Sequence, residues 1–208
     1  MIQGLYAITP SGLEENDLLT KTEVLLKEGI KLIQYRDKIL DKKTFREKAH
    51  ALLKLTKKYG AKLVINDYVE ICLEISADGF HLGLEDFSSE GNIKLLKKNK
   101  EFISKNLICG LSCKWNKELV VNPPENEIKW TYLAVGSFYP SNTKSTIPET
   151  NENVKRKFLS YTDKPLVAIG GINKKNIGEV RSLGYSCFAL SEALFENPQN
   201  VLNEYKRL

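Results

Sequence analysis

The sequence has few of the side chains that usually bind metals or carry redox chemistry. Its 208 residues include two histidines and four cysteines, and no two cysteines form a C-x-x-C pair. Cys109 and Cys113 have the wrong spacing for a common zinc knuckle, and so few histidines leave little to complete one. We therefore expect all four cysteines to be buried free thiols.

Long apolar runs are also missing. No segment approaches the roughly 18 uncharged apolar residues that cross a membrane, and the opening MIQGLYAITP has no basic stretch followed by an apolar one. We expect a cytoplasmic protein without a membrane partner. The apolar fraction of 42% and charged fraction of 27% are ordinary for a globular chain. No linker or low-complexity tract interrupts it, which predicts a single domain over residues 1–208.

Positive charge is in excess, but it is not concentrated. The net charge is +5, and the densest basic run, KLLKKNK at 94–100, has the pattern of a solvated helix face. We therefore expect no nucleic-acid partner. Individual basic residues could instead serve small phosphorylated substrates. The sequence leaves open whether the chain forms a homo-oligomer.

Short apolar runs alternate along the chain with longer segments of helical period. The runs are apolar on both faces, as in parallel strands covered by helices. Eight of them in about 200 residues predict an α/β fold, a closed (β/α)8 TIM barrel, rather than a doubly wound sheet. The expected strands are 4–9, 31–36, 62–66, 79–83, 107–112, 130–137, 165–170 and 187–191. The main expected helices are 15–28, 42–58, 90–100, 149–160, 173–182 and 197–207, with about two turns after the fifth strand.

In such a barrel the active site lies at the carboxyl ends of the strands. Loops are polar in any protein, but that explains poorly why amides, carboxylates, cations and glycines recur at successive strand ends. Arg36 and Lys38 follow the second strand and share one side if the chain is extended, so they could clamp a diphosphate. A solvated pair is as compatible with the sequence. Gln34 points into the barrel, as a core group or a substrate partner.

Two carboxylates follow neighbouring strands. Asp67 ends the third strand and Asp86 follows the fourth. Two carboxylates beside a diphosphate suit Mg²⁺, which takes few protein ligands and keeps several waters. Asp67 could instead only cap the helix that follows. His81, on the fourth strand, is interpreted as a packed structural histidine.

The later strand ends suggest a phosphate site. Gly170 and Gly171 stand where the seventh strand meets its helix, and glycines let backbone N–H groups approach an anion. A tight turn without a ligand is the alternative. The loop 141–148 is polar, and its Thr143 and Lys144 could contact phosphate and close over it.

Together these segments resemble the thiamine phosphate synthase family, over nearly the whole chain. The motifs that carry the resemblance are IQYRDK, INDYVEICLEISADGFHLGLED, GLSCKW, VGSFYPSNTK and VAIGGI. The resemblance implies coupling of a pyrimidine methyl diphosphate to a thiazole phosphate, with diphosphate leaving first. The family uses Mg²⁺, and the chemistry needs charge stabilisation more than a general base.

The resemblance also implies roles for individual residues. Asp67 and Asp86 would hold Mg²⁺, while Arg36, Lys38, Asn66 and Lys144 would bind the diphosphate. Gln34 and Ser112 would line the pyrimidine pocket, with Ser112 near the departing oxygen. Ser112, Lys144 and Arg36 would be the catalytic residues. The thiazole phosphate would be bound by Ser141, Thr143, Gly170, Gly171 and Ser191.

The chain departs from the family pattern at four positions. Tyr68 replaces an arginine, Ser137 a proline, Lys114 a histidine and Glu192 a small residue. The segment from Asp86 to the fifth strand is also longer than expected, which suggests an extended fourth helix. Three alternatives stay open: a thiazole tautomerase, a non-catalytic ligand-binding relative, and an unrelated phosphate-binding barrel isomerase. Tyr68 and Glu192 are the departures that keep the non-catalytic relative open. Lys114 argues against the tautomerase, and the paired carboxylates argue against the unrelated isomerase.

Overall fold

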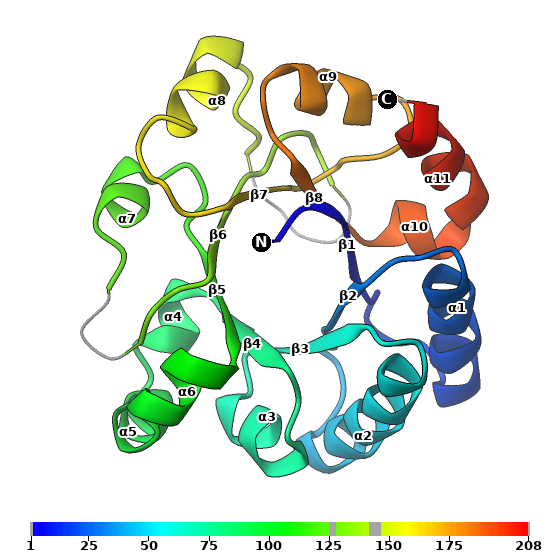
Figure 1. The fold of residues 1–208 in the computed structure, drawn as a ribbon, viewed down its shortest axis with the longest axis vertical. Coiled ribbons are helices and arrows are strands. Elements are labelled where there is room, and N and C mark those ends of the chain that lie inside the picture. The colour runs from blue at the N-terminus through cyan, green and yellow to red at the C-terminus, as the bar shows by residue number, and fades with distance from the viewer. Residues whose placement is uncertain (1, 125–127, 142–146, 208) are drawn as a thin grey trace.

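The protein folds as a closed barrel of eight parallel strands surrounded by helices (Figure 1). The structure is a computed structural model that describes residues 2–124, 128–141 and 147–207. Each strand pairs with the next along the chain, and β8 (Cys187–Leu190) closes the barrel against β1 (Gly4–Ile8). The expected (β/α)8 fold is confirmed.

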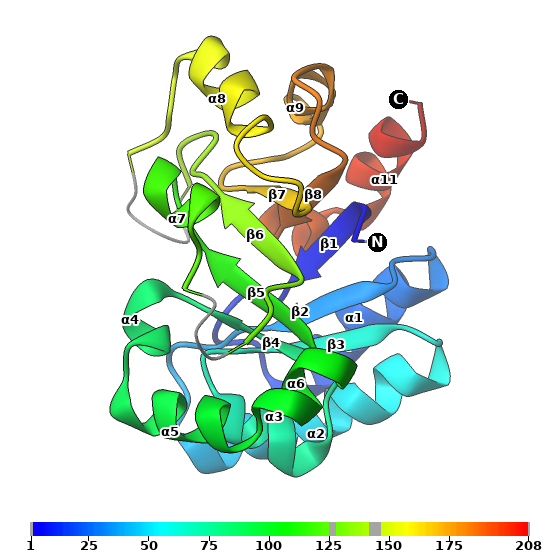
Figure 2. The same ribbon diagram turned by 60° about the vertical axis from the view of Figure 1, so that its left-hand side comes forward.

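Of the remaining strands, β3 has the expected bounds, and the others lie inside the expected runs and are shorter at one end or both. Figure 2 shows the strands crossing the molecule obliquely inside the layer of helices. They are β2 (Leu32–Tyr35), β3 (Lys62–Asn66), β4 (Gly79–Leu82), β5 (Ile108–Ser112), β6 (Tyr132–Val135) and β7 (Leu166–Ile169).

Some of the helices, among them α2 and α8, start at a side-chain cap. The Asp41 side chain accepts hydrogen bonds from the N–H groups of Lys43 and Thr44, at 2.9 and 3.1 Å, and so begins α2. Asn151 likewise caps α8, which therefore starts later than expected. The helices are α1 (Glu15–Lys27), α2 (Lys42–Lys58), α3 (Val69–Ile75), α4 (Leu84–Phe87), α5 (Glu90–Lys98), α6 (Lys100–Asn106), α7 (Lys117–Val121), α8 (Glu152–Phe158), α9 (Ile177–Ser182), α10 (Glu192–Glu196) and α11 (Pro198–Arg207).

The expectation of one extended fourth helix was wrong. The chain between β4 and β5 forms three short helices, α4, α5 and α6. Asn99 ends α5: its backbone leaves helical geometry (φ −112°, ψ 14°), and its side-chain amide donates to the carbonyl of Leu95 at 2.9 Å. Asparagine competes in this way with the helical hydrogen bonds. The lysines of the 94–100 run are exposed, as expected of a solvated face.

Two apolar cores stabilise the barrel. The larger one lies between the sheet and the helices, and the smaller one fills the barrel interior. Tyr6 and Tyr132 belong to the interior core, where their ring centroids are 5.7 Å apart. All four cysteines are buried free thiols, as expected. Within the described ranges no helix is long and apolar enough to span a membrane.

Candidate active site

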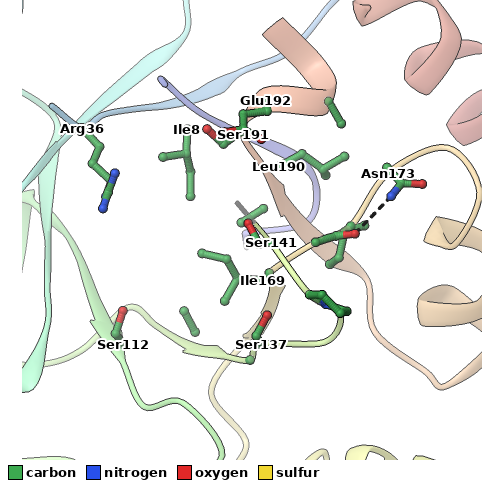
Figure 3. Close-up of a pocket in the computed structure, with 18 of the residues that line it drawn as sticks. Ile8, Arg36, Ser112, Ser137, Ser141, Ile169, Asn173, Leu190, Ser191 and Glu192 are labelled. Carbon is green, nitrogen blue, oxygen red and sulfur yellow. Dashed lines mark hydrogen bonds between the residues drawn. The ribbon is translucent and has the colours of Figure 1, made fainter. Parts of the chain in front are cut away.

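A cavity of about 410 Å³ opens at the carboxyl ends of the strands (Figure 3). Its walls come from the ends of β2, β5, β6, β7 and β8 and the loops that follow them. In Figure 3, Arg36 and Ser112 enter from one side, while Ser191 and Glu192 lie across from Ser137. The sequence-predicted residues that line it are Arg36, Ser112, Ser141, Gly170, Gly171 and Ser191.

The turn at Gly170 and Gly171 requires glycine at both positions. Their φ angles are +100° and +65°, in the region that side chains disfavour. A Cβ on Gly170 would overlap the side chain of Ser137, and one on Gly171 would overlap the carbonyl oxygen of Pro140. Two asparagine amides, from Asn173 at 3.2 Å and Asn176 at 3.0 Å, donate to the Gly171 carbonyl. The turn is therefore held rigidly at the cavity wall.

The end of β8 presents an unusual pair of side chains to the same cavity. The Ser191 hydroxyl is buried and has no hydrogen-bond partner in the described part of the chain. Glu192 follows it and also lines the cavity. Glu192 therefore stands at the cavity wall where the thiazole phosphate is predicted to bind.

Arg36 is held by its backbone. The hydroxyl of Thr9 donates to the carbonyl of Arg36 at 3.0 Å and accepts from its N–H at 2.9 Å. The neighbouring Asp37 is buried, and its carboxylate accepts from the N–H groups of Gly12 at 2.9 Å and Ile39 at 3.0 Å. Asp37 thus joins the loops after β1 and β2, a structural role for the middle residue of R-D-K that the sequence did not reveal.

Lys38, Asn66 and Asp67 form a second group beside the cavity. The Lys38 ammonium contacts Asp67 Oδ2, which also accepts from the Asn66 amide at 2.7 Å. Lys38 is therefore not merely a solvated cation. Burial raises the pKa of Asp67; the Lys38 ammonium opposes that shift, and the nearby Asp86 carboxyl adds to it. The structure thus brings the two predicted metal ligands together.

The helix-capping alternative for Asp67 was wrong. The first residue before α3 is Tyr68, no side chain caps that helix, and Asp67 itself has a left-handed backbone with φ 65°. A residue that the sequence did not single out, Asn92 of α5, donates to the carbonyls of Asp86 at 2.7 Å and Asp67 at 3.4 Å. Asn92 ties the two carboxylate loops together. No sequence motif pointed to it.

A buried chain of hydrogen bonds crosses the barrel below the cavity. Gln34 donates to the Tyr6 hydroxyl at 2.7 Å, and Tyr6 bonds to the Tyr132 hydroxyl at 2.7 Å. Tyr132 bonds to His81 Nδ1 at 2.9 Å, and His81 Nε2 to the Ser112 hydroxyl at 2.8 Å. His81 therefore does more than pack. Gln34 is 2% exposed and contacts Tyr6 rather than the cavity wall.

Three of the four departures from the family pattern line the cavity. They are Lys114, Ser137 and Glu192. The fourth, Tyr68, packs against Phe45 of α2, with ring centroids 4.9 Å apart. Most of the departures thus lie in the candidate site itself. Thr143 and Lys144 lie outside the described residues, so their predicted contacts stay predictions from the resemblance.

The chain is similar to known proteins along most of its length. Residues 5–194 match the family described as "Thiamine monophosphate synthase". The thiamine-phosphate synthase of Nitrosospira multiformis is 37% identical over 196 residues, covering 93% of this chain and 79% of that protein. That of Methanobrevibacter smithii is 31% identical over 208 residues, covering 97% and 95%. The solved thiamine phosphate pyrophosphorylase from Pyrococcus furiosus is 27% identical with a TM-score of 0.76, covering 99% and 96%. The chain belongs to the thiamine monophosphate synthase family.

Proposed function

We propose that this chain couples 4-amino-2-methyl-5-hydroxymethylpyrimidine diphosphate to thiazole phosphate, giving thiamine phosphate and diphosphate. One observation carries the proposal beside the family relationship. The cation Arg36, the hydroxyl of Ser112 and the Gly170–Gly171 turn open onto one cavity, and the carboxylate pair stands at the neighbouring strand ends. Both substrates are small phosphorylated molecules. We place the reaction in the cytoplasm, on the sequence features alone.

The proposed reaction breaks a carbon–oxygen bond before a carbon–nitrogen bond forms. The departing diphosphate keeps the bonding electron pair, and a thiazole nitrogen then donates its lone pair to the pyrimidine methylene cation. Arg36 and Lys38 neutralise charge that builds on the leaving group, and Ser112 donates a hydrogen bond to it. Asn66 and, by the resemblance, Lys144 contribute further contacts to the diphosphate.

The thiazole phosphate is assigned to the opposite side of the cavity. Gly170, Gly171 and Ser141 line that side, and the Ser191 hydroxyl offers a hydrogen bond that no group in the described part of the chain takes. The resemblance adds Thr143. Gln34 stays in the proposal as a residue of the pyrimidine pocket, acting through its contact with Tyr6.

Asp67 and Asp86 are suited to act as ligands of a Mg²⁺ ion. Their two carboxylates stand close together, and a cation, the Lys38 ammonium, already contacts Asp67. Within the described residues no cluster of three or more metal-binding side chains exists, which suits an ion that completes its shell with diphosphate and water. Bound there, Mg²⁺ would neutralise the charge of the leaving diphosphate.

The tautomerase remains the alternative that differs most in chemistry. A tautomerase must move a carbon-bound proton and so needs a positioned base. The family histidine for that task is replaced by Lys114, whose side chain is exposed at the cavity rim. The geometry therefore favours the synthase.

The test is to incubate the purified protein with both substrates and Mg²⁺ and to measure thiamine phosphate and diphosphate by chromatography. We expect both products in equal amounts. Rapid isomerisation of thiazole carboxylate phosphate, with no thiamine phosphate formed, would instead identify the tautomerase.

The metal assignment has its own test. Excess EDTA, Asp67→Asn and Asp86→Asn should each remove most of the coupling activity and most of the Mn²⁺ binding seen by electron paramagnetic resonance. Asp163→Asn makes the same charge change at an exposed position away from the cavity and serves as the control. Unchanged Mn²⁺ binding in both site variants would contradict the assignment.

A further inference from the structure

With Nε2 of Gln34 facing Tyr6, the hydrogen-bond chain from Gln34 to Ser112 has only one consistent set of donors. Tyr6, Tyr132 and His81, which link the two, are each at most 5% exposed, so water does not complete their hydrogen bonds. Burial raises the pKa of the Tyr6 and Tyr132 hydroxyls, so both keep their protons. Each hydroxyl can donate one hydrogen bond only.

The Gln34 amide sets the direction at one end. Its Nε2 group can only donate, so the Tyr6 oxygen accepts from it. In the described part of the chain the Tyr6 hydroxyl has one other partner, Tyr132. If Tyr132 donated to Tyr6, the Tyr6 proton would be buried without an acceptor, which costs about 1–3 kcal/mol. Tyr6 therefore donates to Tyr132.

The direction then passes along the chain. The Tyr132 proton goes to His81 Nδ1, which must accept and so carries no proton. The neutral imidazole consequently carries its proton on Nε2, which donates to the Ser112 oxygen. The Ser112 hydroxyl accepts that bond, and its own proton is left to point into the cavity that the residue lines. Figure 3 shows this hydroxyl facing the cavity.

We propose that Tyr6, Tyr132 and His81 are positioning residues that fix the His81 tautomer and thereby aim the Ser112 proton at the leaving group. The proposal rests on the proposed function for the identity of that leaving group. It links the residue assigned to the pyrimidine, Gln34, to the hydroxyl that assists departure. A donor aimed in advance stabilises developing charge without reorganisation in the transition state.

The opposite direction of donation would give a different protonation pattern at His81 and Ser112. With the Gln34 oxygen facing Tyr6, the direction of every hydrogen bond in the chain reverses. His81 then carries its proton on Nδ1, and the Ser112 hydroxyl donates its hydrogen bond to His81 Nε2. Ser112 would then offer the leaving group only lone pairs. The tautomer of a single histidine thus distinguishes the two arrangements.

That tautomer can be measured without substrate or metal. The chain has two histidines, and His50 lies on the outer face of α2. The His50→Gln variant loses the His50 signals, so the remaining histidine signals belong to His81. In ¹⁵N-histidine-labelled protein near neutral pH, we expect His81 to be neutral with the proton on Nε2. A proton on Nδ1, or a doubly protonated ring, overturns the proposal.

Variants test whether the chain sets the tautomer. Gln34→Glu, once ionised, places only acceptor oxygens opposite Tyr6 and should then move the His81 proton to Nδ1, whereas a protonated carboxyl would donate as the amide does. Tyr6→Phe breaks the chain and should leave a mixture of tautomers, even if the glutamate is poorly tolerated. Tyr35→Phe is the matched control, because Tyr35 is equally buried and its hydroxyl has no partner among the described residues. An unchanged His81 spectrum in Tyr6→Phe and Gln34→Glu contradicts the proposal.

Kinetics supply the link to function. A misaimed Ser112 proton weakens an interaction made in the transition state, so Tyr6→Phe and Tyr132→Phe should lower kcat by about tenfold or more with a much smaller change in KM. Tyr35→Phe should retain the wild-type values. A shifted tautomer with wild-type kcat would refute the role of the chain in catalysis. An inactive wild-type protein with the expected tautomer would count against the proposed function alone.

Discussion

The carboxylate of Asp67 lies between a cation and a second carboxylate. Its side chain is 12% exposed and contacts Lys38. Burial and Asp86 nevertheless raise its pKa above the ordinary value for aspartate. A carboxyl whose pKa is higher in the folded protein than in the unfolded chain favours folding while it is protonated. That advantage disappears as the pH rises through the folded-state pKa.

Asp67→Asn should therefore change stability in a pH-dependent direction. At pH 7 the variant no longer has a buried ionised carboxylate, and we expect a higher free energy of unfolding than in the wild type. Below about pH 3 the aspartate is protonated in both states, so the difference should vanish. Urea unfolding of the metal-free protein at both pH values measures this. A variant less stable at pH 7 would show that the Lys38 contact outweighs burial.

Glu192 places a negative charge where a phosphate is expected to bind. We predict that Glu192→Gln lowers KM for thiazole phosphate by roughly fivefold, since a nearby like charge costs about 1 kcal/mol in a hydrated site. Glu196→Gln, on the exposed side of the same helix, should have no effect. Steady-state kinetics with each variant measure the KM for thiazole phosphate. Weaker binding in Glu192→Gln would mean that the carboxylate contacts the substrate favourably.

Among the elements, α5 matters to the site although it contributes no predicted ligand. Asn92→Ala removes both bonds from this helix to the carboxylate loops. We expect Mn²⁺ affinity to fall by about tenfold or more, as when other residues that orient metal ligands are removed. Asn99→Ala is the control, because its amide bonds within the helix region alone. Equal Mn²⁺ affinity in the two variants would rule out this role for Asn92.

The strands and their polar ends were predictable because their signals are local. Apolar runs and the residues that follow them can be read without knowing the fold, and parallel pairing then places Arg36, Asp67 and Ser112 at one end of the barrel. The division of the chain after β4 was not predictable. It depends on the side-chain contact of Asn99, which a periodic pattern does not contain.

The hydrogen-bond chain was hidden for another reason. Tyr6, Tyr132 and His81 sit within strands that are apolar on both faces, so alternation does not tell which side chains point inward. Their contacts join residues up to 126 positions apart, and they need the register of five strands to be known. Gly110 adds to this: a Cβ there would overlap Tyr132. A single glycine in a strand does not indicate which side chain packs against it.

At the scale of the whole molecule, the site draws on strand ends from around the barrel. A ligand bound there connects segments that are distant along the chain and binds the folded state alone. Inorganic diphosphate with Mg²⁺, at about a hundred times its Kd, should raise Tm by roughly 5–10 °C. Differential scanning fluorimetry measures this, and Asp67→Asn should show a smaller shift. No shift in the wild type would contradict a diphosphate site.

The pairing of β1 with β8 has a consequence for synthesis of the protein. Gly4 lies opposite Cys187 and Ala7 opposite Leu190, so β1 is synthesised well before the strand that pairs with its second edge. Until β8 arrives, the first strand has an open edge and the cavity lacks one wall. The candidate site therefore stays incomplete until β8 has been synthesised, and an unpaired β1 edge is the surface that a chaperone would need to shield.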